Sequence, residues 1–280
     1  MKIPKSANRA PSGKRRNIGR GYWLKVARIP NNRVAKFFSE PVSKEEARRI
    51  SKAHEIFIRL LREAGVNVPE TGMEKKIMRN GQVRLRIIQQ GFPPESLGEQ
   101  VLRNSGAREA IAFGRRLVDE TIKVHRFNRE VAGPRYGVIV GADFKPDNIA
   151  LEDGRIVFID TFSPHIRPLK EPDRINPAFA RYFAKRGWAL EKLTKGYISQ
   201  TVYDPKKRMA SLMAELSRVR PDLARPFIQA ARERIEEEKD PVVRAELLAA
   251  VQRWPVLKAR GMGRLISYLG KRKGMTIKLG

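Results

Sequence analysis

Two carboxylates, an amide and a lysine stand close together in residues 141–162 of this 280-residue chain. Asp143 is followed by Lys145 and then by Asn148, and a second carboxylate, Asp160, ends the apolar run that follows. A carboxylate can orient a hydroxyl group as a base, and a lysine can neutralise the charge of a phosphoryl group. Carboxylate and amide oxygens are ligands that suit Mg²⁺. This set of residue types favours the chemistry of phosphoryl transfer.

The same segment predicts the elements that would position these side chains. Two short strands are expected over 149–151 and 156–159, joined by Asp153-Gly154. A side chain that directly follows an apolar strand is held rigidly, and Asp160 stands at that position.

The residues before this segment predict a small antiparallel sheet. Ser43 begins a helix that Glu46 completes as a capping box, and Gly65 ends it. A long helix is expected from Ala107 to about Val131, and the chain is predicted helical from Asn176 onward. The first strands are predicted at 22–29, 33–38, 77–79 and 83–88, the last two joined by Asn80-Gly81.

These elements predict an α+β protein in two lobes, with a cleft between them. We expect a basic disordered arm over 1–16, a strand-rich lobe with one helix over 17–92, and a larger helical lobe over 93–280. The boundary falls at a hinge-like Gln-Gln-Gly sequence, where Gln89 and Gln90 are candidate contacts for a nucleotide.

Residues 143–148 resemble the D-[LF]-K-P-x-N catalytic loop of the protein-kinase-like superfamily. Asp160 falls where that family has its metal-binding Asp-Phe-Gly aspartate, and Val34-Ala35-Lys36 resembles its V-A-I-K strand. The resemblance covers about residues 20–170, and no family is recognised in 171–280. It implies a bilobal kinase-like fold with a small antiparallel N-lobe, an ATP site and Mg²⁺.

The resemblance also implies roles for single residues. Asp143 would be the catalytic base, and Lys145 would neutralise the transferring phosphoryl group. Asn148 and Asp160 would hold Mg²⁺, and Lys36 would contact the α- and β-phosphates.

Lys36 would in turn be oriented by an acidic side chain of the following helix. Glu55 is our first choice, and Glu45 and Glu46 at the start of that helix are alternatives.

Several departures separate the chain from conventional protein kinases. No G-x-G-x-x-G loop precedes the first hairpin, Gly141-Ala142 replaces the family's His-Arg, Thr161-Phe162 replaces its Phe-Gly, and no A-P-E follows. The resemblance is therefore to the compact atypical branch of aminoglycoside- and choline-phosphotransferase-like, lipopolysaccharide-core and RIO-type kinases.

Composition sets further limits. The chain has no cysteine, which excludes disulfides, thiol nucleophiles and Cys-ligated zinc. No apolar run is long enough to span a bilayer, and no secretory signal begins the sequence, so we expect a cytoplasmic protein.

The net charge of +28 is concentrated at the two ends. Residues 1–20 and 255–280 carry seven Lys or Arg each and no acid. Such ends attract polyanions, so an alternative is a kinase-fold scaffold that binds nucleic acid or a ribonucleoprotein. If the protein is a kinase, the hydroxyl group that accepts the phosphoryl group could belong to a protein, a sugar or a lipid-linked sugar.

Overall fold

The computed structural model describes residues 17–20, 24–38, 40–132, 140–161 and 205–252. It is a mixed α+β protein with a small antiparallel sheet, as the sequence predicts. The basic arm expected over 1–16 and the basic residues 255–280 lie outside the described residues.

Two compact units divide the chain. We call the first the sheet unit, which contains Met1–Arg48 and Glu70–Phe92, and the second the helical unit, which contains Arg49–Pro69 and Pro93–Gly280. Each unit is described separately below.

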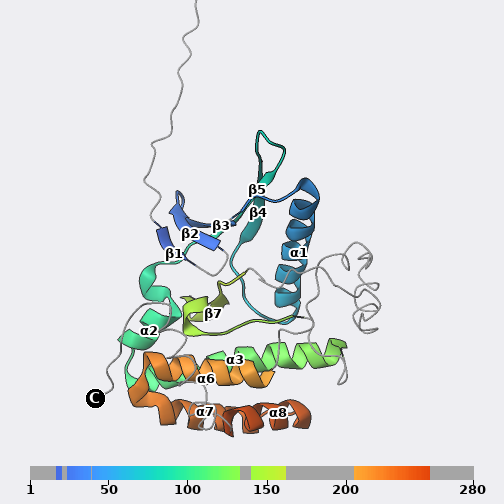
Figure 1. Ribbon diagram of the computed structural model, residues 1–280. Coiled ribbons are helices and arrows are strands. Elements are labelled where there is room, and N and C mark those ends of the chain that lie inside the picture. The colour runs from blue at the N-terminus through green and yellow to red at the C-terminus, as the bar shows by residue number, and fades with distance from the viewer. Residues whose placement is uncertain (1–16, 21–23, 39, 133–139, 162–204, 253–280) are drawn as a thin grey trace, which may run out of the picture. The chain divides into compact units, whose positions relative to one another are not determined.

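The sheet unit holds five antiparallel strands in the order β1-β2-β3-β5-β4 (Figure 1). Its first hairpin turns at Asn31 and Asn32, which both have positive φ, and its second turns near Gly81, whose φ is 79°. Asparagine and glycine tolerate that conformation better than other residues. The strands are β1 (Asn17–Arg20), β2 (Leu24–Ile29), β3 (Arg33–Phe38), β4 (Thr71–Ile77) and β5 (Val83–Gln90).

Both predicted hairpins are present, but β4 runs over Thr71–Ile77 and shares only Ile77 with the strand predicted at 77–79. The apolar pattern did not indicate this extension because β4 is an edge strand whose side chains are mostly exposed. Exposed charged residues are common on such edges, where they discourage pairing with other chains.

Helix α1 (Lys44–Glu63) begins where the capping box predicted. The backbone N–H of Glu46 donates to the Ser43 hydroxyl oxygen at 3.1 Å, and Gly65 follows the helix with φ of 76°. The buried side chains of Ile56 and Leu60 join the core of the helical unit. Residues 49–69 therefore belong to that unit, whereas the sequence analysis placed all of 17–92 in one lobe.

The helical unit surrounds one apolar core, to which Phe113, Leu216, Phe227 and Leu247 contribute from four helices. Figure 1 shows the long helix α3 beside α6, with α7 and α8 next to them. A two-stranded hairpin packs near the short helix α2. The elements are α2 (Gly98–Asn104), α3 (Ala107–Ala132), β6 (Ile149–Glu152), β7 (Arg155–Phe158), α6 (Pro205–Val219), α7 (Ala224–Glu236) and α8 (Pro241–Gln252).

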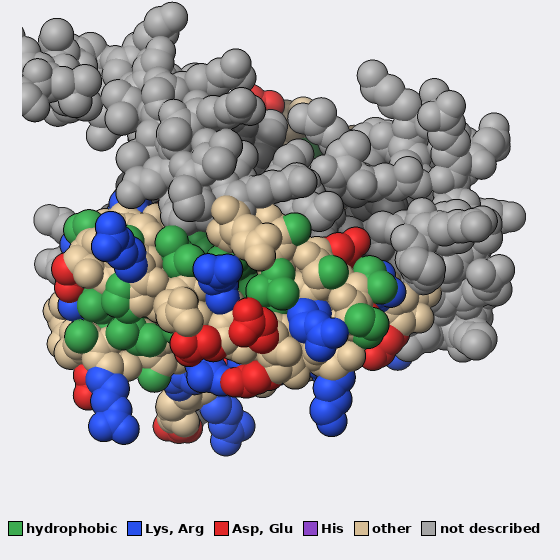
Figure 2. Space-filling view, turned by 90° about the horizontal axis from the view of Figure 1, so that it is seen from below, with side chains coloured by type: hydrophobic (Ala, Val, Ile, Leu, Met, Phe, Trp, Pro, Cys, Tyr) green, Lys and Arg blue, Asp and Glu red, His purple; other side chains and the backbone are tan. Residues whose placement is uncertain are grey.

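Charge is mixed on the face of the helical unit that Figure 2 shows, where side chains of both signs alternate with apolar ones. In the parts of the chain that the structure describes, no helix is long and apolar enough to cross a membrane.

Candidate functional site

Buried side chains hold the candidate loop 140–148 in place. The side-chain amide of Asn128, on α3, donates to the Val140 carbonyl at 2.8 Å and accepts from the Val140 N–H at 2.9 Å. Phe144 is 2% exposed, and its ring centre lies 5.4 Å from that of Phe158 on β7. Because Val140 is bonded to Asn128 and Phe144 is buried, residues 140–144 have little freedom to move.

Helix α2 packs closely against the same loop. A Cβ atom at Gly98 would lie 2.6 Å from the Pro146 carbonyl oxygen, closer than real contacts allow. Leu97 also forms an isolated β-bridge with Ala150 at the start of the hairpin. Glycine at position 98 is therefore what allows the helix to approach the loop backbone.

Two cations meet one carboxylate oxygen within this loop. Oδ2 of Asp143 lies 2.8 Å from Nζ of Lys145 and 2.9 Å from an Nη atom of Arg208. The side chains of Asp143, Arg208 and Lys145 are 17%, 24% and 30% exposed. The cluster is thus accessible to a ligand but shielded enough for its charges to interact strongly.

The charge of the loop also acts on Lys145. Burial by itself would lower the pKa of Lys145, but the hydrogen bond and charge of Asp143 outweigh it, and Asp147 and Glu215 add to the effect. The pKa of Lys145 is therefore raised, and the side chain is fully charged at neutral pH.

The hairpin brings Asn148 and Asp160 to the same place. Ile149 pairs with Phe158, and the Ile159 N–H donates to the Asn148 carbonyl at 2.8 Å. Asn148 thus stands opposite Ile159, the residue directly before Asp160. Its side-chain nitrogen donates to the Asp143 carbonyl at 2.9 Å, which leaves Oδ1 as the atom that can coordinate a cation.

This donor set fits Mg²⁺. The ion prefers oxygen ligands and is commonly held by one or two carboxylates together with substrate phosphates. Asn148 and Asp160 offer one amide and one carboxylate. Among the described residues no group of three or more His, Cys, Asp or Glu side chains is placed to bind a metal by itself. A cation at this position would therefore need further ligands, such as nucleotide phosphates.

The predicted nucleotide contacts lie in the sheet unit. Lys36 on β3 is 8% exposed and pairs with Ile87 of β5, while Val34 pairs with Gln89. Since alternate strand residues share a face, Lys36 and Gln89 are on one face of the sheet. Gln90 is on the other face, and its backbone N–H donates to the Glu70 carbonyl at 2.9 Å.

Glu55 lies on α1, where its carboxylate accepts hydrogen bonds from Nζ of Lys52 at 2.9 and 3.0 Å. The Glu55 side chain is 66% exposed. In the structure Glu55 contacts Lys52. The pairing of Glu55 with Lys36 stays a prediction.

Three residues of the site were missed by the sequence analysis, namely Arg208, Asn128 and Gly98. Each reaches the loop from a helix, and none belongs to a motif; Asn128 is 12 residues before its partner Val140, whereas Gly98 and Arg208 are much farther from the loop in sequence. Only the structure could show that they converge on the loop.

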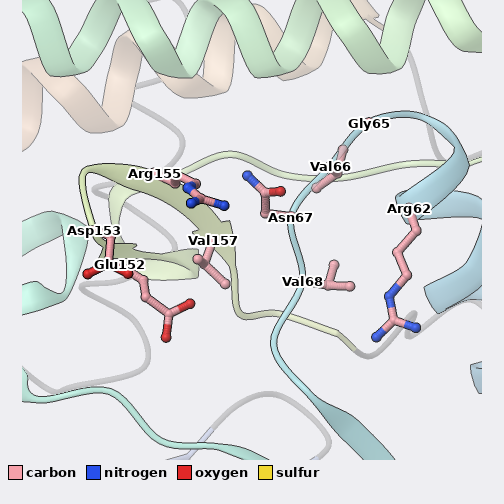
Figure 3. Close-up of a pocket in the computed structure, with 9 residues that line it drawn as sticks. All are labelled: Arg62, Gly65, Val66, Asn67, Val68, Glu152, Asp153, Arg155 and Val157. Atoms are coloured by element: carbon pink, nitrogen blue, oxygen red, sulfur yellow. The ribbon is translucent and has the colours of Figure 1, made fainter.

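Two cavities of the helical unit lie away from this loop. One of about 450 Å³ lies beside the turn of the β6–β7 hairpin, and Figure 3 shows Glu152 and Asp153 on one side of it and Arg62 on the other. A second, of about 440 Å³, shares Asn67 and Arg155 with the first and extends along α3. Neither cavity includes Asp143, Lys145 or Asp160 among its lining residues.

The residues of this site lie within a match to a known protein family. The model of a family of unknown function, DUF6206, matches residues 29–267. The chain belongs to this family. The DUF6206 match includes Lys36, the loop with Asp143, the hairpin end with Asp160, and Arg208. No curated protein matches the chain.

Proposed function

We propose that the protein is an ATP- and Mg²⁺-dependent phosphotransferase with a bilobal protein-kinase-like fold. One observation carries the proposal. A single loop and hairpin gather Asp143, Lys145, Asn148 and Asp160, the four residues that the resemblance assigns to catalysis and metal binding. These four side chains must lie close together for phosphoryl transfer, because the reaction depends on positioning the reacting groups and on stabilising the charge of the phosphoryl group.

Within this proposal Asp143 accepts the proton of the acceptor hydroxyl. Its carboxylate is held by the anchored loop, and a base must lie within hydrogen-bonding distance of the proton that it takes. Lys145, which is 2.8 Å from the same carboxylate, is close enough to move onto a phosphoryl group that approaches Asp143. Its raised pKa keeps the charge that this step requires.

Asn148 and Asp160 would hold Mg²⁺, which when bound would supply positive charge to neutralise the phosphates. The protein's part is to fix these two side chains relative to Asp143. The hydrogen bond from Asn148 to the Asp143 carbonyl does this directly, because it joins the proposed metal ligand to the proposed base.

The sheet unit supplies the proposed nucleotide contacts. Lys36 and Gln89 share one face of the sheet, so both can contact the same ligand. Gln90 would act through its backbone, since its side chain is on the opposite face. The basic composition of the chain disfavours a cationic acceptor such as an aminoglycoside and favours an anionic or protein acceptor.

The proposal is tested by release of ADP from ATP, followed with a coupled assay in Mg²⁺ and then in excess EDTA. We expect slow turnover that needs Mg²⁺, and loss of at least about 90% of it in Lys36→Met. Arg33→Met, an exposed position on the same strand, serves as the matched control and should keep turnover. Turnover that is equal in EDTA, or equal in Lys36→Met, would contradict the proposal.

A second candidate is a kinase-fold scaffold that binds nucleic acid or a ribonucleoprotein through its ends. The charge of +28 and the seven basic residues in each of 1–20 and 255–280 favour it. Binding to duplex DNA should then weaken with salt, with a log–log slope of about 0.9 for each phosphate contacted. A salt-independent affinity would contradict this candidate.

A further inference from the structure

We propose that the β4–β5 hairpin is a docking surface for duplex DNA, which it contacts through phosphate groups on both sides of the major groove. The proposal concerns the sheet unit and does not depend on the proposed phosphotransferase activity. It also differs from the second candidate function, in which the basic ends of the chain bind nucleic acid, because it assigns a surface within residues 75–84.

The argument begins with two cations that face each other across the hairpin. Lys76 of β4 pairs in register with Arg84 of β5, and both side chains are exposed. Residues paired in this way have Cβ atoms about 5 Å apart on one face, and like charges placed there destabilise the strand pair. Among the described residues, no acidic side chain forms an ion pair with Lys76 or Arg84.

The neighbouring pair on the same face has the opposite arrangement. Two residues along each strand, Glu74 pairs in register with Arg86, and the Glu74 carboxylate lies 2.5 Å from an Nη atom of that arginine. Opposite charges thus satisfy each other within the sheet at this position. The Lys76–Arg84 pair does not stabilise the sheet in this way, so its two charges are available to an anion from outside the protein.

Two more cations lie on the same hairpin. Lys75 is on the opposite face of β4, because side chains alternate along a strand, and Arg79 is in the turn. Both side chains are exposed. Strand β5 pairs with β3 only as far as Arg86, so the hairpin continues beyond the end of β3, and Figure 1 shows its turn extending past the first three strands. The hairpin therefore presents cations on both faces and at its tip.

Internal contacts order the hairpin before any ligand binds. The Asn80 side chain accepts a hydrogen bond from the Gln82 N–H at 3.2 Å and donates one to the Gln82 side-chain oxygen at 2.7 Å. Val42 forms an isolated β-bridge with Val83 beside the turn. Because these contacts already fix the hairpin, docking does not carry the full entropy cost of ordering a loop.

The positions of the charges favour duplex DNA over duplex RNA. The major groove of B-form DNA is about 12 Å wide and admits a two-stranded β-ribbon, whereas the major groove of A-form RNA is too deep and narrow. Cations on both faces of a ribbon in the DNA groove can reach phosphates on both of its walls. Such phosphate contacts position a protein on the duplex and supply most of its sequence-independent affinity.

An anionic membrane fits the hairpin less well. Ile77 is apolar and 65% exposed, but the turn that follows it holds Arg79, Asn80 and Gln82, whose polar groups are costly to place in a bilayer core. In a DNA groove the same isoleucine can contact the methyl group of a thymine. DNA therefore accounts for both the charged and the apolar exposed side chains of the hairpin.

The test measures the affinity of the full chain for a fluorescently labelled DNA duplex by anisotropy at several salt concentrations. Lys76→Gln and Arg84→Gln should each lower the log–log slope with salt by about 0.9 and weaken binding about eightfold at about 0.1 M salt, as expected for one lost phosphate contact. Arg232→Gln, an exposed position on α7, changes the net charge equally and should leave both quantities unchanged.

A further variant separates binding from folding. Lys76→Glu places an acid opposite Arg84, as Glu74 is opposite Arg86, so the melting temperature should not fall. DNA binding should weaken more than in Lys76→Gln, because the new carboxylate repels phosphates. A lower melting temperature would show that Lys76 has a structural role and would count against the proposal.

Absence of DNA binding to the unmodified chain would overturn the proposal, as would an unchanged salt slope in Lys76→Gln/Arg84→Gln. An equal loss of affinity for an RNA duplex would overturn the placement in the major groove. Loss of binding to phosphatidylserine vesicles with DNA affinity kept would make the hairpin a membrane contact instead. ATP turnover should be the same in these variants as in the unmodified chain, so failure of this proposal is distinct from failure of the proposed function.

Discussion

Charged side chains are arranged differently near the two ends of the β6–β7 hairpin. At the open end, two cations meet one oxygen of Asp143, and Asn148 is bonded to the backbone of the same residue. Beside the turn, on the wall of the second cavity, charges on the helices form separate pairs, such as Lys123 with Glu120 of α3 at 2.5 Å. Arg234 pairs in the same way with Asp119.

This difference shows that the size of a cavity does not indicate where charged side chains converge on one group. The cavities near the turn have room for a ligand, but four charged side chains on the wall of the second are paired with one another, Lys123 with Glu120 and Arg234 with Asp119. The open end has two cations that converge on one atom, Oδ2 of Asp143. We therefore expect substitutions at the open end to affect function, and those at the turn to affect mainly stability.

The largest effect is expected at Asp143. Asp143→Asn should lower ATP turnover about 10²- to 10⁴-fold, the usual contribution of a general base, and leave ATP affinity within a few-fold. Asp153→Asn is the matched control at the turn, where positive φ suits asparagine as well as aspartate. Steady-state kinetics with both variants measure the contrast, and a fully active Asp143→Asn would refute the role of the base.

The packing of α2 on the loop should give the next largest effect. In Gly98→Ala the new Cβ would meet the Pro146 carbonyl, and the required shift should cost about 2 kcal/mol of unfolding free energy. Turnover should fall as well, because the loop with Asp143 moves. Gly72→Ala has open space around its new Cβ and should change stability by less than about 0.5 kcal/mol. Urea unfolding and ADP release test both, and equal effects would show that the loop is not held by this contact.

A buried carboxylate of α3, on the wall of the second cavity, gives a pH-dependent prediction. Burial raises the pKa of Glu120, and the charge of Asp119 adds to this, while Lys123 opposes it. The folded protein thus keeps this proton to a higher pH than the unfolded chain, so stability is lost as pH rises from 4.5 through the raised pKa.

Glu120→Gln removes this loss. The variant should be more stable than the unmodified chain by about 1 kcal/mol at pH 8 and should show no advantage at pH 4. Glu236→Gln, an exposed position on α7, should show no such pH dependence. Denaturation at the two pH values measures the difference. A Glu120→Gln variant less stable at pH 8 would show that the ionised carboxylate is needed there.

The smallest effect is expected for Glu55→Gln. The exposed pair with Lys52 should contribute less than about 0.5 kcal/mol to stability. ATP affinity should stay within about twofold if Lys52 is the functional partner of Glu55. A tenfold loss of ATP affinity, measured by calorimetry, would instead support the pairing with Lys36 that the family resemblance implies.

Much of the fold was predictable because its signals are local. The Ser43 cap of α1, the turn at Gly81 and the β6–β7 hairpin each depend on residues close in sequence, and the structure contains all three. The proximity of Asp143, Asn148 and Asp160 follows from the same hairpin.

The contacts that sequence could not predict join distant segments. Arg208 lies 65 residues after Asp143, and Asn128 reaches Val140 across the end of α3. The apolar face of α1 is equally compatible with either unit, so its place in the helical core was not predictable from periodicity. Local patterns specify elements, but they do not specify which elements meet.

We propose that the open end of the hairpin holds a Mg²⁺-dependent nucleotide site. Calorimetric titration of ATP into the unmodified chain, with and without Mg²⁺, tests it most directly, with Asp160→Asn as the site variant and Asp153→Asn as the control. We predict binding that requires Mg²⁺, is lost in Asp160→Asn and is kept in Asp153→Asn. No ATP binding to the unmodified chain, or equal binding in Asp160→Asn, would contradict the claim.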